Sequence, residues 1–405
     1  MENRHPKGNG EYIYYLNKVR VLNLIREKVQ ISRSDVVRRT GLSAPTVTRI
    51  VDSLINEDNL VEQIGIGESS GGRPPIILRF AGENHFVVGI DWGRTHIYVR
   101  LSNLNGKSLV EKDIAIESED GFENDIARVK ELIHSLLNES KIDKNKLRGI
   151  GVAAAGFVNV KTGIIEFSPN FNWHNVDICT PLRDEFNVLV IVDNVTRVMA
   201  QGELMYGIGS ECKDFVFVSI GYGIGAGIIM QGKAFYGFDG ITGEIGHNKA
   251  VLDRSENRLC TCGKYDCLES YSSGRGIAET AKNLIKYYPH SSLNDVSVLS
   301  AETVSMAAMK GDELGLKIMD EAAKLIGVAI ASMANNFNPE MVVLGGKVMG
   351  HTDFFIKRVK AVFEKERIQQ TARNIPLIRS GLGTEAAVKG AVSLILNEVL
   401  NLRIE

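Results

Sequence analysis

Residues 215–230, FVFVSIGYGIGAGIIM, decide the fold of this chain, because an apolar strand, a glycine-rich turn and a second apolar strand follow one another there. The same plan recurs at residues 86–101, FVVGIDWGRTHIYVRL, with the turn at Gly93. β-branched and aromatic runs favour strands, and glycines between two such runs favour a hairpin. Two related strand–glycine–strand units predict two similar lobes that face each other across a cleft.

Around these two units the chain alternates short apolar strands with longer amphipathic stretches. We expect further strands at residues 149–156, 188–194 and 342–346, and helices at residues 124–139, 195–206, 302–312, 313–337 and 385–399. Strands mixed with helices in this way indicate an α/β fold with layered sheets.

The first eighty residues predict a winged helix-turn-helix. Apolar residues at three-residue steps mark an amphipathic helix over residues 12–29, and a second short helix follows over residues 32–40. After the turn at Gly41, Ser43 is a good N-cap for a third helix that reaches Asn56. Helix, glycine-containing turn and helix form the pattern whose second helix enters the major groove of DNA.

The third helix of this head separates a core face from a face that can meet DNA. Val47, Ile50, Val51 and Leu54 form its apolar stripe, and Pro45 lies in the first turn, where its missing N–H is tolerated. The candidates for contact with bases or phosphates lie off that stripe: Ser43, Ala44, Pro45, Thr46, Thr48, Arg49 and Ser53.

Residues 60–64 and 76–80 predict the two strands of a wing. The tip between them, residues 65–75, is rich in glycine and carries Arg73, which can enter a narrow A·T-rich minor groove. Winged helices also serve as protein–protein modules, and Gly-Pro tips also serve as plain linkers. The capped third helix together with an arginine-bearing wing favours DNA binding.

Four potential metal ligands lie close together in the second half of the chain. His247 is followed by Cys260, Cys262 and Cys267, and three of the five cysteines therefore fall within eight residues. The alternative is a group of buried or disulfide-bonded cysteines. Three sulfurs and one imidazole complete the tetrahedral shell of structural zinc, so the sequence predicts bound Zn²⁺.

Composition and charge place the chain among ordinary globular proteins. Its 405 residues predict two or three domains, and no apolar run is long enough for a membrane span. Residues 1–80 hold 12 Lys and Arg against 9 Asp and Glu, so a mildly basic head precedes an acidic body, which is compatible with nucleic-acid contact. Because the first residues are polar we expect no signal peptide, and clustered thiols favour the cytoplasm.

The paired glycine loops and the cysteine cluster resemble those of the ROK family, and with the head they resemble ROK repressors of the NagC, Mlc and xylose-repressor type. The resemblance covers essentially the whole chain and implies an actin-like (ribonuclease H-like) sugar-kinase fold behind the winged helix-turn-helix. It implies a DNA-binding domain at 1–80, a smaller lobe at 81–200 with 385–405, and a larger lobe at 201–384 that carries the zinc site and a dimerisation surface.

In that family the sugar lies in the cleft between the lobes. The residues that match its sugar contacts here are Gly156, Asn170, Asn194, Glu244, His247 and Glu269. Taken singly, an asparagine or glutamate of this kind is more often an ordinary turn or surface residue. Zinc on one nitrogen of His247 would leave the other N–H to donate to a sugar hydroxyl.

Two departures from the kinases of the family bear on the activity. The kinases place a catalytic aspartate where this chain has Val195, which cannot accept a proton, although Asp193 lies two positions earlier. In the two loops that hold phosphates in the kinases, Arg94 replaces a glycine and Tyr222 replaces a threonine. Bulky side chains there disfavour nucleotide binding, so we expect no enzyme activity.

The sequence thus predicts a repressor that binds double-stranded operator DNA as a homodimer or tetramer and is released by a monosaccharide. Local similarity to the xylose-repressor branch makes xylose or glucose the first expectations, and a pseudo-palindromic operator would match two-fold symmetry. One alternative is a ROK-family sugar kinase with an added DNA-binding head. Another is a regulator controlled by a partner protein, with a vestigial sugar site.

Overall fold

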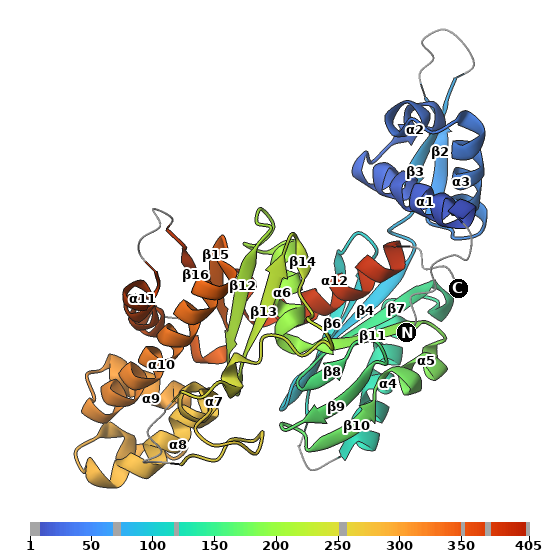
Figure 1. The fold of residues 1–405 in the computed structure, drawn as a ribbon. Coiled ribbons are helices and arrows are strands. Elements are labelled where there is room, and N and C mark those ends of the chain that lie inside the picture. Colours follow the sequence, from blue (N-terminus) through green and yellow to red (C-terminus); the bar gives the residue numbers. More distant parts are fainter. Residues whose placement is uncertain are drawn as a thin grey trace.

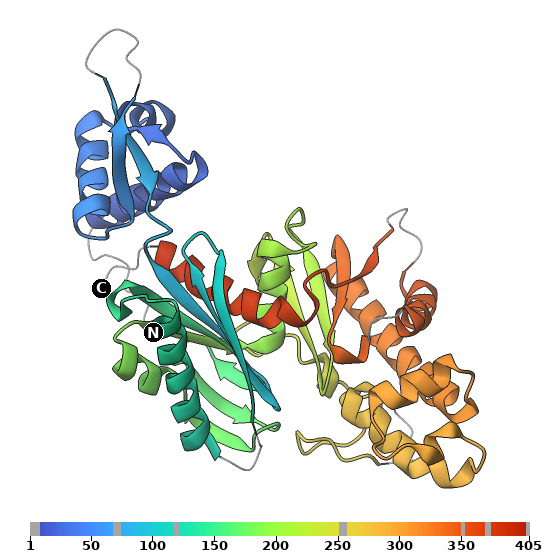
Figure 2. The same ribbon diagram turned by 180° about the vertical axis from the view of Figure 1, so that it is seen from behind.

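The computed structural model describes residues 9–67, 74–116, 121–250, 257–349, 353–368 and 374–401. It consists of a small head followed by two larger lobes that stand side by side (Figures 1 and 2). No helix in the described ranges is long and apolar enough to cross a membrane.

The head contains three helices and a three-stranded sheet. Its elements are α1 (Asn9–Glu27), β1 (Ile31–Ser32), α2 (Arg33–Thr40), α3 (Ala44–Asn56), β2 (Val61–Ile66) and β3 (Ile76–Phe80). Ser43 caps α3 by accepting a hydrogen bond from the Thr46 N–H, and Gly41 takes a left-handed φ of 70° between α2 and α3. The predicted helix-turn-helix and wing strands are confirmed. The two-residue β1, which pairs with β3, was not predicted.

The two lobes are built on five-stranded sheets with the same connectivity. The strands of the first are β4 (Phe86–Trp92), β5 (His96–Asn103), β6 (Ser108–Ala115), β7 (Leu147–Ala154) and β11 (Leu189–Asn194). Those of the second are β12 (Phe215–Ile220), β13 (Ile224–Met230), β14 (Lys233–Ala234), β15 (Met341–Gly345) and β16 (Leu377–Arg379). The spatial orders are β11-β7-β4-β5-β6 and β16-β15-β12-β13-β14. Each sheet contains an antiparallel hairpin, β4–β5 or β12–β13. The first strand of the hairpin also pairs in parallel with β7 or β15, and that strand pairs in parallel with β11 or β16. This shared topology confirms the prediction of two similar lobes.

Helices cover these sheets, and a small sheet flanks the first lobe. The helices are α4 (Gly121–Glu139), α5 (Cys179–Phe186), α6 (Val195–Tyr206), α7 (Glu269–Ser272), α8 (Gly274–Leu284), α9 (Ala301–Met309), α10 (Glu313–Phe337), α11 (Phe354–Glu366) and α12 (Ala386–Leu400). The small sheet contains β8 (Phe157–Asn159), β9 (Ile164–Ser168) and β10 (Trp173–Asp177). The helices predicted at 124–139, 195–206 and 313–337 are confirmed, and the predicted helix at 302–312 ends at Met309.

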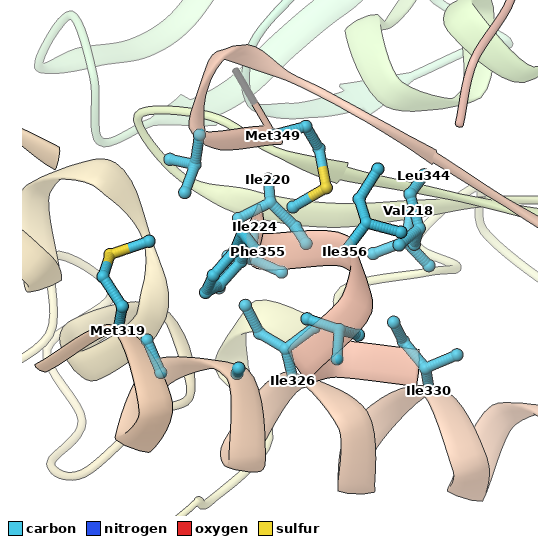
Figure 3. Packing of buried hydrophobic residues seen from close by; sticks show 14 of the residues in the cluster. Val218, Ile220, Ile224, Met319, Ile326, Ile330, Leu344, Met349, Phe355 and Ile356 are labelled. Carbon is cyan, nitrogen blue, oxygen red and sulfur yellow. The ribbon is translucent and has the colours of Figure 1, made fainter. Parts of the chain in front are cut away.

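Each lobe has its own apolar core. In the second lobe, α10 and α11 pack on the sheet, and Figure 3 shows Ile326 and Ile330 of α10 facing the strand residues Val218 and Leu344. All four side chains are at most 1% exposed. Burial of this kind is the main favourable term in folding.

Helix α12 joins the head to the first lobe. A Cβ atom added at Gly151 of β7 would lie 2.1 Å from the Ala391 carbonyl oxygen, so the missing side chain lets α12 lie directly on the sheet. At its other end, Ile395 and Leu400 belong to the same buried cluster as Leu22 of the head. The core of the head is therefore continuous with the helix that covers the first sheet; in Figure 1 this helix is red and lies between the two lobes, with one end toward the head.

Candidate functional site

The four predicted metal ligands converge. The ligand atoms of His247, Cys260, Cys262 and Cys267 all lie within 4.8 Å of one another. Cys260 Sγ is 3.6 Å from His247 Nδ1, and Cys262 Sγ is 3.7 Å from Cys267 Sγ. A tight turn brings the thiols together, since the Cys260 N–H donates to the Lys264 carbonyl and Gly263 takes a φ of 83°.

The chemistry of this cluster fits zinc. All five cysteines of the chain are free thiols, so the disulfide alternative does not apply to them. Burial opposes ionisation of Cys260, but hydrogen bonds with His247 and Cys262 lower the pKa of its thiol to about 6. Thiolates and a neutral imidazole are the ligands that structural zinc takes, and four of them leave no open position.

The residues of the first lobe that match the sugar contacts of the family are Asn194, Gly156 and Asn170. Asn194 caps α6, where its Oδ1 accepts from the Thr196 N–H at 2.9 Å, and its Nδ2 donates to the Gly156 carbonyl at 3.0 Å. Gly156 has a φ of 134°, and a Cβ atom there would lie 2.7 Å from the Phe167 carbonyl oxygen. Only glycine fits at this position. Asn170 lies in the turn after β9 and is half-buried.

The second lobe contributes Glu244, His247 and Glu269. His247 Nε2 is 3.9 Å from Glu244 Oε2, so the ring presents one nitrogen to the thiols and the other to this carboxylate. Burial raises the pKa of Glu244. Glu269 accepts from the Ile224 N–H at 2.9 Å and from the Thr261 hydroxyl at 3.3 Å.

An aromatic contact brings the two groups together across the lobes. Phe157, which directly follows Gly156, has its ring centroid 6.1 Å from that of His247. The segment that follows Gly156 therefore lies against the imidazole of His247. Together the two groups offer amide, carboxylate and imidazole groups, which are the donors and acceptors that sugar hydroxyls need.

Asp193 is enclosed in a polar network that the sequence reading did not anticipate. Its side chain is 1% exposed, and its Oδ1 lies 2.9 Å from Nε and 2.8 Å from Nη2 of Arg197. The Tyr236 hydroxyl donates to Oδ2 at 3.1 Å, and Arg197 also donates to the Gly240 carbonyl at 2.9 Å. The four-residue spacing of Asp193 and Arg197 was the available sequence signal for this pair.

Three backbone N–H groups of the two glycine loops already have hydrogen-bond partners within the protein. The Gly93 N–H donates to the His96 carbonyl at 3.0 Å, and the Gly221 N–H donates to the Gly223 carbonyl at 2.9 Å. The Ile224 N–H is taken by Glu269. A phosphate-binding loop needs such N–H groups to point at its ligand, and these three are already in use.

On helix α3, most of the residues predicted to contact DNA are accessible. Ala44, Pro45, Thr48 and Arg49 line an open groove, and Arg49 lies 4.3 Å from the ring centroid of Tyr14. Ser43 and Thr46 hydrogen-bond to each other through their hydroxyls at 2.8 Å.

Two of the predicted DNA contacts need separate comment. Ser53 was expected to face DNA; it does line the same groove, but its side chain is only 6% exposed and receives a hydrogen bond from Lys18 at 2.8 Å. Helix α1 covers that turn of α3 and takes Ser53 into the interior of the head. Arg73 lies outside the described residues, so its contact with the minor groove stays a prediction.

The fold and the site define an actin-like two-lobed protein with a DNA-binding head. Residues 87–398 match the ROK family, and residues 16–58 match a winged helix-turn-helix DNA-binding family. The chain belongs to the ROK family.

The relatives include both repressors and kinases. The chain is 29% identical to the xylose repressor of Caldicellulosiruptor bescii over 97% of this chain and 98% of that protein. It is 32% identical to the glucokinase of Halalkalibacterium halodurans over 76% of this chain and 94% of that protein. It also superimposes on the crystal structure of a ROK family transcriptional regulator homologous to the E. coli MLC protein, with a TM-score of 0.81 and 27% identity over 96% of this chain and 98% of the other.

Proposed function

We propose that this protein is a transcriptional repressor that binds a monosaccharide in the cleft between its lobes and operator DNA with its head. The winged helix-turn-helix supports the DNA partner. The sugar is supported by the polar groups of Asn194 and Gly156 in the first lobe and of Glu244, His247 and Glu269 in the second, and by the contact between Phe157 and His247 that joins the lobes there.

The burial of Asp193 in a hydrogen-bonded network is the observation that favours a sugar sensor over a sugar kinase. A general base must reach the proton that it removes with a free lone pair. Asp193 is instead enclosed by Arg197 and Tyr236, and Val195 follows it at the start of α6. The groups of the proposed sugar site can therefore hold a sugar, but neither Asp193 nor Val195 offers a general base for its phosphorylation.

Zinc would act here as a structural element. The cluster of His247, Cys260, Cys262 and Cys267 would hold the ion, and the ion would fix the segment that ends at Glu269. With Nδ1 of His247 facing the thiols, Nε2 is left to donate a hydrogen bond toward Glu244 or a sugar hydroxyl.

Helices α6 and α12 connect the cleft with the head. Asn194 caps the start of α6, and α6 crosses α12 closely, because a Cβ atom at Gly390 would lie 2.0 Å from the Val198 carbonyl oxygen. The far end of α12 packs in the core of the head. Sugar binding that closes the cleft would shift α6 against α12, change the pose of the head and lower its affinity for the operator.

For the effector, xylose and glucose are the first candidates, and the similarity to a xylose repressor supports the former. We further propose a homodimer or tetramer that reads a pseudo-palindromic operator, with α3 of each head in the major groove and Arg73 of each wing in the minor groove. The dimerisation surface would belong to the larger lobe at 201–384, beside a smaller lobe at 81–200 with 385–405.

A thermal-shift screen tests this proposal. D-xylose and D-glucose would be added to the full-length protein with and without Mg²⁺-ATP, since a ligand that binds only the native state raises its melting temperature. We expect one of the sugars to raise the melting temperature and ATP to add nothing. A protein that responds to neither of these nor to other monosaccharides would favour control by a partner protein.

The similarity to a glucokinase keeps the kinase as the second candidate. ATP-dependent formation of a sugar phosphate, abolished in Asp193→Asn, would establish that candidate. It would also mean that Asp193 leaves Arg197 when substrate binds.

A further inference from the structure

The two loops that depart from the kinase pattern contact each other across the cleft. Arg94 follows β4 of the first sheet and Tyr222 follows β12 of the second. The guanidinium carbon of Arg94 lies 4.2 Å from the ring centroid of Tyr222. A guanidinium at this distance from an aromatic ring makes a cation–π contact, and here the contact joins the tips of the two lobes.

The loop that carries Tyr222 is also coupled to the candidate sugar site. Two residues beyond Tyr222, the Ile224 N–H donates to Glu269 Oε2. A Cβ atom at Gly223 would lie 2.5 Å from the same oxygen, so the carboxylate packs directly on the backbone of this loop. The loop that carries Tyr222 is therefore one of the contacts of Glu269, beside the hydroxyl of Thr261.

We propose that Arg94 and Tyr222 form an interlobe latch, which holds the two glycine loops together and positions Glu269 against the first lobe. In this chain the guanidinium of Arg94 lies against the opposite loop, and the N–H groups of Gly93, Gly221 and Ile224 in these loops are already hydrogen-bonded. The consequence for effector binding rests on the proposed function. Arg94 and Tyr222 are positioning residues, since they act on the sugar through Glu269.

A double-mutant cycle on the ligand-free, full-length protein tests the latch. Arg94→Ala, Tyr222→Ala and the double variant would be compared by amide hydrogen exchange over residues 221–224 and by small-angle X-ray scattering. We expect each single variant to speed exchange by about two- to fivefold, the range that a cation–π contact of this exposure supports. The double variant should add almost nothing, and all three should have a larger radius of gyration than the parent.

Two control variants separate the latch from general loosening. Tyr222→Phe keeps the ring and should behave as the parent. Arg358→Ala removes a comparable contact with Phe354, at 3.7 Å within α11, and should leave exchange over 221–224 unchanged. Additive effects of the two single variants, or an unchanged radius of gyration in all three variants, would overturn the latch.

Titration with D-xylose and D-glucose adds the test of effector positioning. If the parent binds either sugar, the latch predicts that Arg94→Ala weakens binding by about two- to fivefold while Tyr222→Phe does not. Equal affinities of the parent and Arg94→Ala would refute the positioning role. If the parent binds neither sugar, the proposed effectors are wrong, and the exchange and scattering data still decide the latch, because they contain no ligand.

Discussion

Single residues in this chain combine two tasks, and Cys260 is the clearest case. Its thiol belongs to the cluster that could hold a metal ion and is also the hydrogen-bond partner of His247, which faces Glu244 in the candidate sugar site. We expect Cys260→Ser to release zinc and to lower the melting temperature, because metal binding at such a site contributes to folding.

Elemental analysis with thermal denaturation checks this expectation. The matched control is Cys212→Ser, which removes a thiol that lies outside the cluster. Parent protein that contains no zinc after purification without chelator would refute the metal site itself.

Asp91, at the end of β4, predicts a pH dependence of stability. Burial raises the pKa of its carboxyl to about 7, with Asp113 acting in the same direction and Lys347 opposing it. The native state therefore keeps a proton that the unfolded chain releases near pH 4. Stability from this group is present at low pH and is lost as the pH rises toward about 7.

Asp91→Asn removes this titration. Relative to the parent, we expect the melting temperature of the variant to rise as the pH is increased from 5 to 8. A constant difference between the two proteins over this range would contradict the elevated pKa.

At the scale of elements, the sequence was most informative where a pattern is local. The hairpins around Gly93 and residues 221–223, the cap at Ser43 and the apolar stripe of α3 were all predicted from spacing alone. Strand β1 was missed because a two-residue strand carries no periodicity and exists only through its pairing with β3.

Contacts between distant segments could not be predicted in the same way. Arg94 and Tyr222 were recognised as two separate departures from the kinase sequences, but their contact depends on the relative orientation of the two lobes. The burial of Ser53 was not predicted, because α1 covers that turn of α3 through Lys18. The direction of the Asp193 side chain likewise follows from the buried network around Arg197.

The crossing of α6 and α12 leads to a prediction at this scale. Gly390→Ala would place a methyl group 2.0 Å from the Val198 carbonyl oxygen, so the helices must separate. We expect a loss of about 1–3 kcal/mol in the free energy of unfolding, as in other overpacked interiors. Chemical denaturation measures it.

The control is Gly10→Ala in α1, where no atom lies within 4 Å of the added carbon. It should be neutral or slightly stabilising, because alanine favours a helix. If both variants were equally stable, the two helices would not be closely packed.

Helix α3 carries the prediction for DNA recognition. Thr48 is exposed in the groove of α3, so Thr48→Ala should lose about 1–3 kcal/mol of discrimination at one base pair of the operator. Ser332→Ala removes an exposed hydroxyl on α10 and should leave operator binding unchanged. Binding assays on single-base operator variants measure the difference, and equal losses on all sequences would indicate a phosphate contact.

At the scale of the whole molecule, α6 and α12 form a continuous packed path from Asn194 to the head, and the proposed function couples the sugar site with the DNA site along it. If a sugar lowers the affinity for operator DNA by some factor, the DNA must lower the affinity for that sugar by the same factor. Such couplings are typically about 5- to 150-fold. We expect both factors to agree when they are measured at one salt concentration, since phosphate contacts make DNA affinity strongly salt-dependent.

The variant Gly390→Ala tests whether the contact between α6 and α12 transmits the coupling, separately from the affinity of either binding site. It lies in neither the cleft nor α3, so the affinity for sugar without DNA should stay near that of the parent while the coupling factor falls toward one. Titrations of sugar with and without operator, and of operator with and without sugar, measure all four affinities. A variant with separated helices but an unchanged coupling factor would show that the signal reaches the head by a route other than α12.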